Sequence, residues 1–378
     1  ALIREAARQS MVLLKNDANL LPLQPGVHKK IAVIGPNANV CRLGNYSGKP
    51  VKTVSLFEGI RDYLGDRAQV VCTEGCKIAN NDTGHSYDNW RYINEIDFAT
   101  VQDNQVLIDQ AVEVASDADL VVLALGENVL LSREAWAANH AGDRTTFDLT
   151  ESQVVLAESV LATGKPVILF LNNSKPVTLH DLEGRIPAII TAHYAGQETG
   201  TAAAEILFGD VSPSGKLTLS WPQSVGHLPS HYSQNKSAKV FDYIDAPRES
   251  MYAFGHGLSY TTFDYGTPSL SQNVIRHGET IELRVDVTNS GSRAGAEIVQ
   301  LYVSGQEFPL ARPDLELKGF RRVYLEPNET RTVAIELEAD DLHFHDYNLQ
   351  RTLPDGKYLV FVGGSTRALS EPITLKTK

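Results

Sequence analysis

The stretch KIAVIGP (30–36) decides how the first half of this chain folds. It is a short apolar run that ends in Gly-Pro, and such a run is typical of a buried parallel strand that meets a turn. Comparable apolar runs recur at 68–76, 119–127, 165–174 and 187–196. We expect each of them to form a strand of one sheet.

Segments with helical spacing separate these runs. VSLFEGIRDYLG (54–65) ends in a glycine stop, and TESQVVLAESVLATG (150–164) combines a threonine cap with an apolar stripe and a glycine exit. Residues 104–118 and 198–210 have the pattern of further helices. Strands that alternate with helices predict a mostly parallel sheet covered on both faces, which is a three-layer α/β/α sandwich.

The pattern changes near residue 224, where a segment rich in Pro, Ser, His and Tyr begins. From about residue 263 the helical periodicity disappears, and short alternating runs with turn signals predict an immunoglobulin-like β-sandwich. The expected strands are TIELRVDVTNSG (280–291), AEIVQLYVSG (296–305), ELKGFRRVYLEP (316–327), RTVAIELEA (331–339) and GKYLVFVGGS (356–365). We therefore expect domains at 1–224 and 263–378, joined by an extended connector at 225–262.

The composition excludes several classes of function. The 378 residues carry a formal net charge of −12, and an acidic surface repels the phosphate backbone of nucleic acids. No apolar stretch is long enough to span a bilayer, so no membrane association is expected. The first residues, 1–16, are amphipathic without an apolar signal core, and any targeting signal is expected upstream. We expect a periplasmic or secreted location rather than a cytoplasmic one.

The cysteines are Cys41, Cys72 and Cys76, an odd number that allows at most one internal disulfide. Cys72 and Cys76 enclose a short loop that an oxidising compartment would allow to close, whereas the simpler interpretation is small buried or loop cysteines. A zinc site needs more ligands nearby, and none follow in the sequence. We therefore expect no metal and no organic cofactor.

Longer motifs, in order along nearly the whole chain, resemble glycoside hydrolase family 3. VLLKND (12–17) and KKIAVIGPNAN (29–39) resemble the start of the second domain of that family. HYAGQETGTAAAEILFGDVSPSGKLTLSWPQSVGHLP (193–229) is the strongest match. YAFGHGLSYTTF (252–263) resembles the hinge before the family's fibronectin type III-like domain, and RPDLELKGFRRVYLEPNET (312–330) resembles the signature of that domain.

The resemblance implies a retaining β-glycosidase, with terminal β-D-glucosyl residues as the first expected substrate and β-xylosides as the alternative. Such enzymes place two carboxyl groups about 5 Å apart. In this family the nucleophile is an aspartate on an amino-terminal (β/α)8 barrel, and the general acid/base is a glutamate on the α/β sandwich domain. These residues contain no barrel, so we expect the barrel as a partner chain or fragment. A homo-oligomer remains an open alternative.

The segment GENVLLSREAWAANHAGDRTTFDL (126–149) follows a predicted strand and is expected to carry the acid/base, because open α/β sheets bind ligands at strand ends. The family pattern favours Glu134, although common forms have the glutamate closer to the following arginine. Trp136 is expected to remove water from this carboxyl and favour its protonated form. Arg133 would oppose that effect if it pointed at the carboxylate, and we expect Arg133 and Trp136 to contact substrate. Glu127 is the rival acid/base.

Other polar residues have both a functional and a structural interpretation. Asn45 and Tyr46, in the turn GNYSG, are expected to line the sugar site, and a simple turn is the alternative. Asp143 and Arg144 are expected to form an ion pair that braces the loop. A lone His140 is more often a surface or hydrogen-bonded residue than a proton shuttle.

Other function classes fit less well. The motif IAVIGPNAN (31–39) lacks the glycine fingerprint and the lysine of nucleotide-binding loops, and Pro36 removes a backbone donor that a phosphate would need. No G-x-S-x-G elbow supports a serine hydrolase. A non-catalytic carbohydrate-binding or interaction module is the alternative of a different class, and for such a module Glu134→Gln would leave ligand binding intact.

Overall fold

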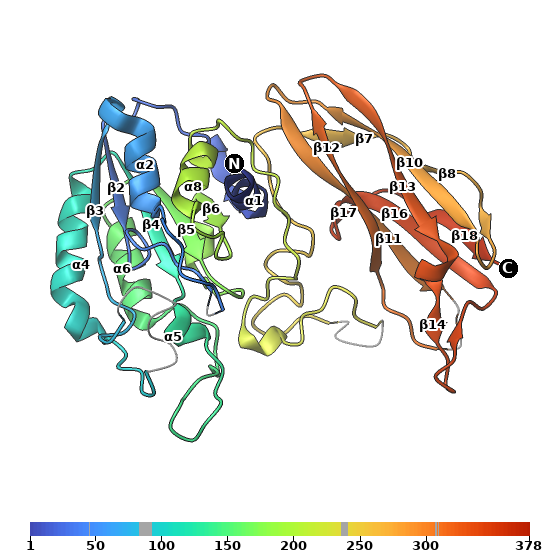
Figure 1. Cartoon of the computed structure of the whole chain (residues 1–378), viewed down its shortest axis with the longest axis horizontal. Coiled ribbons are helices and arrows are strands. Elements are labelled where there is room, and N and C mark those ends of the chain that lie inside the picture. The colour runs from blue at the N-terminus through green and yellow to red at the C-terminus, as the bar shows by residue number, and fades with distance from the viewer. Residues whose placement is uncertain (45, 83–92, 236–240, 307, 309) are drawn as a thin grey trace. The chain divides into compact units, whose positions relative to one another are not determined.

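The computed structural model describes residues 1–44, 46–82, 93–235, 241–306, 308 and 310–378. The chain forms two compact units (Figure 1). The α/β unit comprises Ala1–Gly215 and Gln223–Val225, and the β-sandwich unit comprises Lys216–Pro222 and Gly226–Lys378. The domain boundaries expected from the sequence, at 224 and 262, stay predictions.

The α/β unit is built on a six-stranded sheet, counted over the described residues, with the order β1-β6-β5-β4-β2-β3. Its strands are β1 (Val12–Asn16), β2 (Lys30–Ile34), β3 (Gln69–Thr73), β4 (Leu120–Gly126), β5 (Val167–Asn172) and β6 (Ala188–Thr191). Strands β2 to β6 pair in parallel, and only β1 is antiparallel to its neighbour within this sheet. The expected mostly parallel sheet is confirmed.

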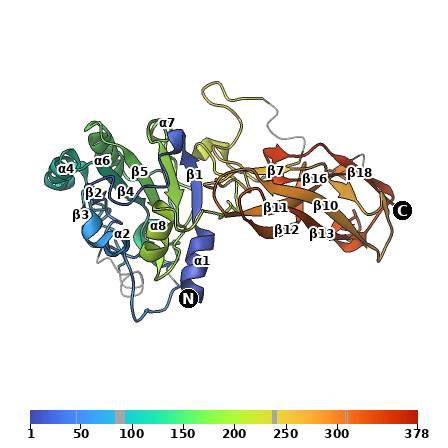
Figure 2. The same ribbon diagram turned by 90° about the horizontal axis from the view of Figure 1, so that it is seen from above.

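Helices cover both faces of this sheet, which makes the three layers (Figure 2). The helices are α1 (Leu2–Ser10), α2 (Leu56–Leu64), α4 (Val101–Ser116), α5 (Val129–Ser132), α6 (Glu151–Leu161), α7 (Leu182–Arg185) and α8 (Thr199–Leu207). Helices α4 and α6 pack against each other on one face, while α2 and α1 pack against α8 on the other. Because both faces are covered, every residue of β4 and β5 is buried.

A close approach of two helices fixes the layer formed by α2 and α8. Helix α2 begins with a capping box, in which Ser55 and Glu58 each bond the other's backbone N–H. A Cβ on Gly59 would lie 2.0 Å from the carbonyl oxygen of Gly200, so glycine is required where the helices cross. The expected helix at 54–65 is therefore confirmed with slightly shorter bounds.

The edge strand β1 was not predicted from the sequence. The amphipathic first segment divides into helix α1 and strand β1, with Met11 between them in an extended conformation. Strand β1 runs antiparallel along β6. A short strand beside a helix lacks a turn signal at its start, which explains why periodicity alone does not separate the two.

The β-sandwich unit contains the two expected layers of strands. One sheet has the order β13-β10-β7 with β8 beside β10, and the other has the order β12-β11-β16-β18-β9 with β17 beside β16. The long strands are β10 (Thr280–Asn289), β11 (Gly295–Gln306), β12 (Glu316–Leu325), β13 (Thr330–Glu338) and β16 (Gly356–Ser365). The short strands are β7 (Phe263–Tyr265), β8 (Ser269–Leu270), β9 (Val274–Ile275), β14 (Phe344–His345), β15 (Arg351–Thr352), β17 (Ala368–Leu369) and β18 (Ile373–Thr377).

Alternate residues of the long strands form the core of this unit. On β10 the side chains of Ile281, Leu283, Val285 and Val287 all point into it. This alternation is what the sequence pattern predicted, and the expected β-sandwich is confirmed. In neither unit is any helix among the described residues long and apolar enough to cross a membrane.

Candidate active site

The site lies where the order of the parallel strands reverses. From β2 the chain goes outward to β3 and then returns to β4 on the other side of β2. Open α/β sheets bind ligands at such a reversal, beyond the carboxyl ends of the strands. The loops after β2 and after β4 both start here. Gly35, which follows β2, lies close to the backbone of β4, since an added Cβ would lie 2.2 Å from the carbonyl oxygen of Ala124.

Glu127 directly follows β4, and its carboxylate is fully engaged inside the protein. The residue is only 1% exposed. Its Oε2 accepts hydrogen bonds from the backbone N–H and the hydroxyl of Ser174, at 3.0 and 2.9 Å, and its Oε1 forms an ion pair with Lys175. Glu127 thus ties the end of β4 to the segment after β5. This arrangement supports a structural role for the rival acid/base.

Beyond α5 the chain makes a narrow loop, residues 133–143, which we call the 133–143 loop (Figure 1). Its two stems are joined because the N–H of Asp143 donates to the carbonyl oxygen of Arg133 at 3.0 Å. Nearer the tip, the N–H of His140 donates to the carbonyl oxygen of Ala137 at 2.9 Å. The loop therefore has a defined conformation, and its residues 134–139 are exposed.

Glu134 lies at the start of this exposed stretch. Trp136 is 67% exposed and makes an edge contact with His140, with the ring centroids 5.1 Å apart. Glu134 and Trp136 are both exposed in this chain, and the expected removal of water from Glu134 by Trp136 stays a prediction. Both side chains are available to a ligand that approaches the loop.

Arg133, which the sequence suggested as a substrate contact, is buried and bonded to the backbone. The residue is 2% exposed. Its Nε donates to the carbonyl oxygen of Ala141 at 2.6 Å, and its Nη atoms donate to the carbonyl oxygens of Ile93 and Asn94. Burial lowers the pKa of the Arg133 guanidinium. The guanidinium is turned into the protein, and the expected contact of Arg133 with substrate stays a prediction.

The remaining loop residues bind neighbours other than those expected. Asp143 Oδ2 accepts the N–H of Ala135 at 3.3 Å, and Arg144 donates to the carbonyl oxygen of Asp148 at 2.8 Å. The expected ion pair between Asp143 and Arg144 is thus replaced by two separate contacts with the backbone. His140 is buried, with Nδ1 at 3.4 Å from Asn94 Oδ1, as expected for a hydrogen-bonded histidine.

The turn after Leu43 is described only in part. Asn45 lies outside the described residues. Tyr46 is 83% exposed, and Ser47 closes the turn with its N–H and its hydroxyl, which donate to the carbonyl oxygen of Gly44 at 3.0 and 2.7 Å. An exposed tyrosine on a closed turn is compatible with a sugar contact and with a simple turn, so its role stays a prediction.

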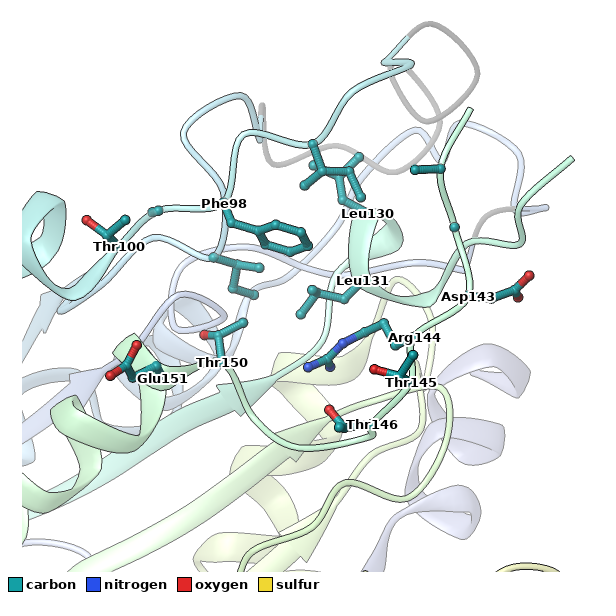
Figure 3. Close-up of a pocket in the computed structure, with 15 residues that line it drawn as sticks. Phe98, Thr100, Leu130, Leu131, Asp143, Arg144, Thr145, Thr146, Thr150 and Glu151 are labelled. Carbon is teal, nitrogen blue, oxygen red and sulfur yellow. The ribbon is translucent and has the colours of Figure 1, made fainter. Parts of the chain in front are cut away.

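A cavity of about 580 Å³ lies against the base of the 133–143 loop (Figure 3). Phe98, Leu130 and Leu131 form its apolar side, while Arg144 and Glu151 contribute polar groups. Asp143 points away from the other labelled side chains in Figure 3. Residues 141–143 of the loop line this cavity, but Glu134 does not, so the candidate acid/base lies outside it.

A second, polar cavity of about 250 Å³ lies beside the segment that follows β2, and the sequence did not predict it. Arg42 is buried in its wall and pairs with Asp82 at 2.9 Å. Asp82 also accepts from the side chain of Asn128 at 2.9 Å. Burial raises the pKa of Glu74, which lies in the same wall. This ion pair and this hydrogen bond join segments far apart in the sequence, where no spacing rule reveals them.

The cysteines form no disulfide in this structure. Cys76 is buried, and burial raises the pKa of its thiol. Burial also raises the pKa of the Cys72 thiol to about 11. Within the described parts of the chain, no group of three or more His, Cys, Asp or Glu side chains is arranged to hold a metal ion.

The sequence and the structure are both similar to known β-glycosidases. The chain is 35% identical to a β-xylosidase of Formosa agariphila, over 96% of this chain and 48% of that protein. It is also 35% identical to a periplasmic β-glucosidase of Salmonella typhimurium, over 95% of this chain and 48% of that protein. A β-glucosidase structure from Erythrobacter marinus superposes with a TM-score of 0.94 at 37% identity, over 99% of this chain and 50% of that chain.

The chain thus spans about half the length of the relatives that it matches. A fibronectin type III-like domain matches residues 297–366. The glycosyl hydrolase family 3 C-terminal domain matches residues 11–260, which is well over half of the chain. On these matches, together with a candidate acid/base loop at the carboxyl end of β4, the chain belongs to glycosyl hydrolase family 3.

Proposed function

We propose that this chain supplies the general acid/base and part of the sugar site of a retaining exo-β-glycosidase. The observation that carries the proposal is the contrast between two carboxylates at the reversal of strand order. Glu127 is buried and held by Ser174 and Lys175, whereas Glu134 is exposed on a closed loop. A proton donor must reach the leaving oxygen of a substrate, and this requirement favours the exposed Glu134 over the buried Glu127.

The proposed reaction proceeds by double displacement. An aspartate attacks the anomeric carbon while protonated Glu134 gives its proton to the glycosidic oxygen, so that the bond to the leaving group breaks as the glycosyl-enzyme bond forms. Glu134, now a carboxylate, then removes a proton from water. That water attacks the anomeric carbon, and the aspartate leaves.

The attacking aspartate is proposed to lie on a (β/α)8 barrel outside these 378 residues. The match to about half of each relative leaves room for such a segment in the complete enzyme. The barrel would be joined to this chain or would associate with it as a separate fragment. The two carboxyl groups must come within about 5 Å of each other, so the 133–143 loop is proposed to face the barrel.

The proposed substrates are glycosides with a terminal non-reducing β-D-glucosyl residue, and β-xylosides are the second candidate. Relatives with either name match this chain at the same 35% identity. Tyr46 and Trp136 are proposed to contact the sugar, because exposed aromatic rings offer an apolar face with a polar edge. A periplasmic or secreted location is proposed from the periplasmic relative.

The experiment that tests the proposal is Glu134→Ala in the complete enzyme. Loss of the acid should lower kcat on an alkyl β-glucoside by about 10²- to 10⁴-fold, because a poor leaving group needs a proton. The dinitrophenolate of a dinitrophenyl β-glucoside leaves without protonation, so the glycosylation step on that substrate should change little. Azide should speed the second step, in which the glycosyl-enzyme is broken down. Glu113→Ala, at an exposed position of α4, is the matched control.

The same experiment discriminates between the rival carboxylates. If Glu127→Ala showed the leaving-group dependence and the azide rescue while Glu134→Ala did not, the role would move to Glu127. If neither variant showed them, the chain would not supply the acid/base.

A further inference from the structure

We propose that Arg133 is a positioning residue for the acid/base, which acts by holding the backbone of Glu134 and does not touch the sugar. This inference rests on the proposed function, since it takes Glu134 as the proton donor. Arg133 is buried, whereas the next residue in the sequence, Glu134, is exposed.

The first support is the set of bonds that the guanidinium makes. Arg133 Nε donates to the carbonyl oxygen of Ala141 on the returning stem, at 2.6 Å. Its Nη atoms donate to the carbonyl oxygens of Ile93 and Asn94, the latter at 2.8 Å. The planar fork of an arginine suits several acceptors at once. One side chain therefore fastens both stems of the loop to a separate segment of the α/β unit.

The second support is the bonding on either side of Glu134. The carbonyl oxygen of Arg133 accepts the N–H of Asp143 at 3.0 Å, and the N–H of Ala135 donates to Asp143 Oδ2 at 3.3 Å. The residues before and after Glu134 are both bonded to Asp143. The backbone of Glu134 is thereby held in place, while its side chain stays exposed.

The third support is a close backbone contact. A Cβ on Gly142 would lie 2.3 Å from the backbone nitrogen of Ala135 and 2.3 Å from the carbonyl carbon of Glu134. The peptide that follows Glu134 is thus packed directly on Gly142. No side chain fits between the two stems at this point, so the position of Glu134 depends on how tightly Arg133 and Asp143 close the loop.

The expected consequence is kinetic, because proton transfer requires the acid within hydrogen-bond reach of the leaving oxygen. A displacement of about 1 Å can cost about 10²-fold in rate. A loosened loop should therefore weaken acid catalysis but leave sugar binding unchanged. Direct binding of sugar by Arg133 would produce the opposite pattern, a raised KM with little dependence on the leaving group.

The test uses Arg133→Met in the complete enzyme, with Arg61→Met as the control at an exposed arginine on α2. We expect Arg133→Met to lower kcat on an alkyl β-glucoside about 10- to 100-fold. KM on the alkyl β-glucoside and kcat/KM on a dinitrophenyl β-glucoside should stay within about twofold of the starting enzyme, since the sugar contacts are unaffected and the first step on the dinitrophenyl substrate needs no proton. Arg133→Lys, which keeps the charge without the fork, should lie between the two.

A second readout keeps the test independent of activity. Hydrogen exchange should become faster at the amides of Ala135, His140 and Asp143 in Arg133→Met and unchanged in Arg61→Met. Gly142→Ala should reproduce the kinetic pattern without removing a charge. An equal rise in KM on both substrates, or unchanged kinetics with unchanged exchange, would overturn the inference.

The outcome for Glu134→Ala distinguishes failure of the proposed acid/base from failure of the positioning role of Arg133. If Glu134→Ala shows no dependence on the leaving group, the proposed function fails first. If that variant behaves as expected and Arg133→Met does not, only the positioning role fails.

Discussion

At the scale of single residues, burial and pairing distinguish two glutamates that the sequence leaves as rivals, because Glu127 is buried and paired whereas Glu134 is exposed. Glu134 could be selected from the sequence because it follows a strand end and fits a family pattern. The burial of Arg133 could not, since the carbonyl groups that it binds belong to residues 93 and 94, which no local pattern connects to it. The same holds for the pair of Arg42 with Asp82.

A first prediction concerns Glu127 and the stability of the α/β unit. Replacing Glu127 by Ala should lower the free energy of unfolding by about 2–3 kcal/mol, because it leaves the hydrogen-bond donors of Ser174 and the ammonium of Lys175 without their buried acceptor. Urea unfolding measures this change. Glu113→Ala should change the free energy by less than about 0.5 kcal/mol. Equal stabilities of the two variants would refute the structural role.

A second prediction at this scale concerns alkaline pH. The pKa of Cys72 is raised by burial from 9.0 to about 11, so between these values the unfolded chain has lost a proton that the folded chain keeps. The unfolded state is then favoured, and the free energy of unfolding should fall by up to about 2–3 kcal/mol from pH 9 to pH 11. Burial also raises the pKa of the Cys41 and Cys76 thiols, so Cys72→Ala should make the slope shallower without abolishing it when urea unfolding is repeated across the range. An unchanged slope would contradict the assignment to Cys72.

At the scale of elements, the sequence predicted best where the periodicity was longest. Strands β4 and β5 are continuous apolar runs and β10 alternates apolar and polar residues, and in all three the burial in the structure follows the sequence pattern. Strand β1 was missed because it follows α1 without a turn signal. The close crossing of α2 and α8 could not be predicted either, since a glycine within one helix does not indicate which other helix packs against it.

That crossing carries a third prediction. Gly59→Ala should destabilise the α/β unit by about 1–3 kcal/mol, because the added Cβ would lie 2.0 Å from the carbonyl oxygen of Gly200 and the helices would have to separate. The matched control is Gly184→Ala in helix α7, where nothing lies within 4 Å of the added Cβ. This control should be neutral or more stable by up to about 1 kcal/mol. Thermal unfolding of both variants decides the matter, and equal losses would contradict the close crossing.

At the scale of the whole molecule, the proposed function divides one active site between this chain and a barrel. The sequence predicted this division through its resemblance to a family. Burial and hydrogen bonds now favour Glu134 as this chain's contribution.

A fourth prediction follows for the purified 378-residue chain. Without a barrel it should not hydrolyse an aryl β-glucoside, since the nucleophile, which must lie about 5 Å from the proposed acid/base, is proposed to be on the barrel. Addition of a matching barrel fragment should restore turnover, and addition of the fragment to Glu134→Ala should not restore it on an alkyl β-glucoside. Turnover by the purified chain alone would contradict the division of the site.

The most direct test of the central claim is to trap the glycosyl-enzyme intermediate. The complete enzyme would be treated with a fluorinated glucosyl donor, whose intermediate is hydrolysed slowly, and the labelled peptide would be located by mass spectrometry. We predict that the sugar is attached to an aspartate of the barrel and that residues 1–378 stay unlabelled. A sugar attached to Glu134, or to any other residue of this chain, would contradict the assignment of Glu134 as the acid/base and of the nucleophile to the barrel.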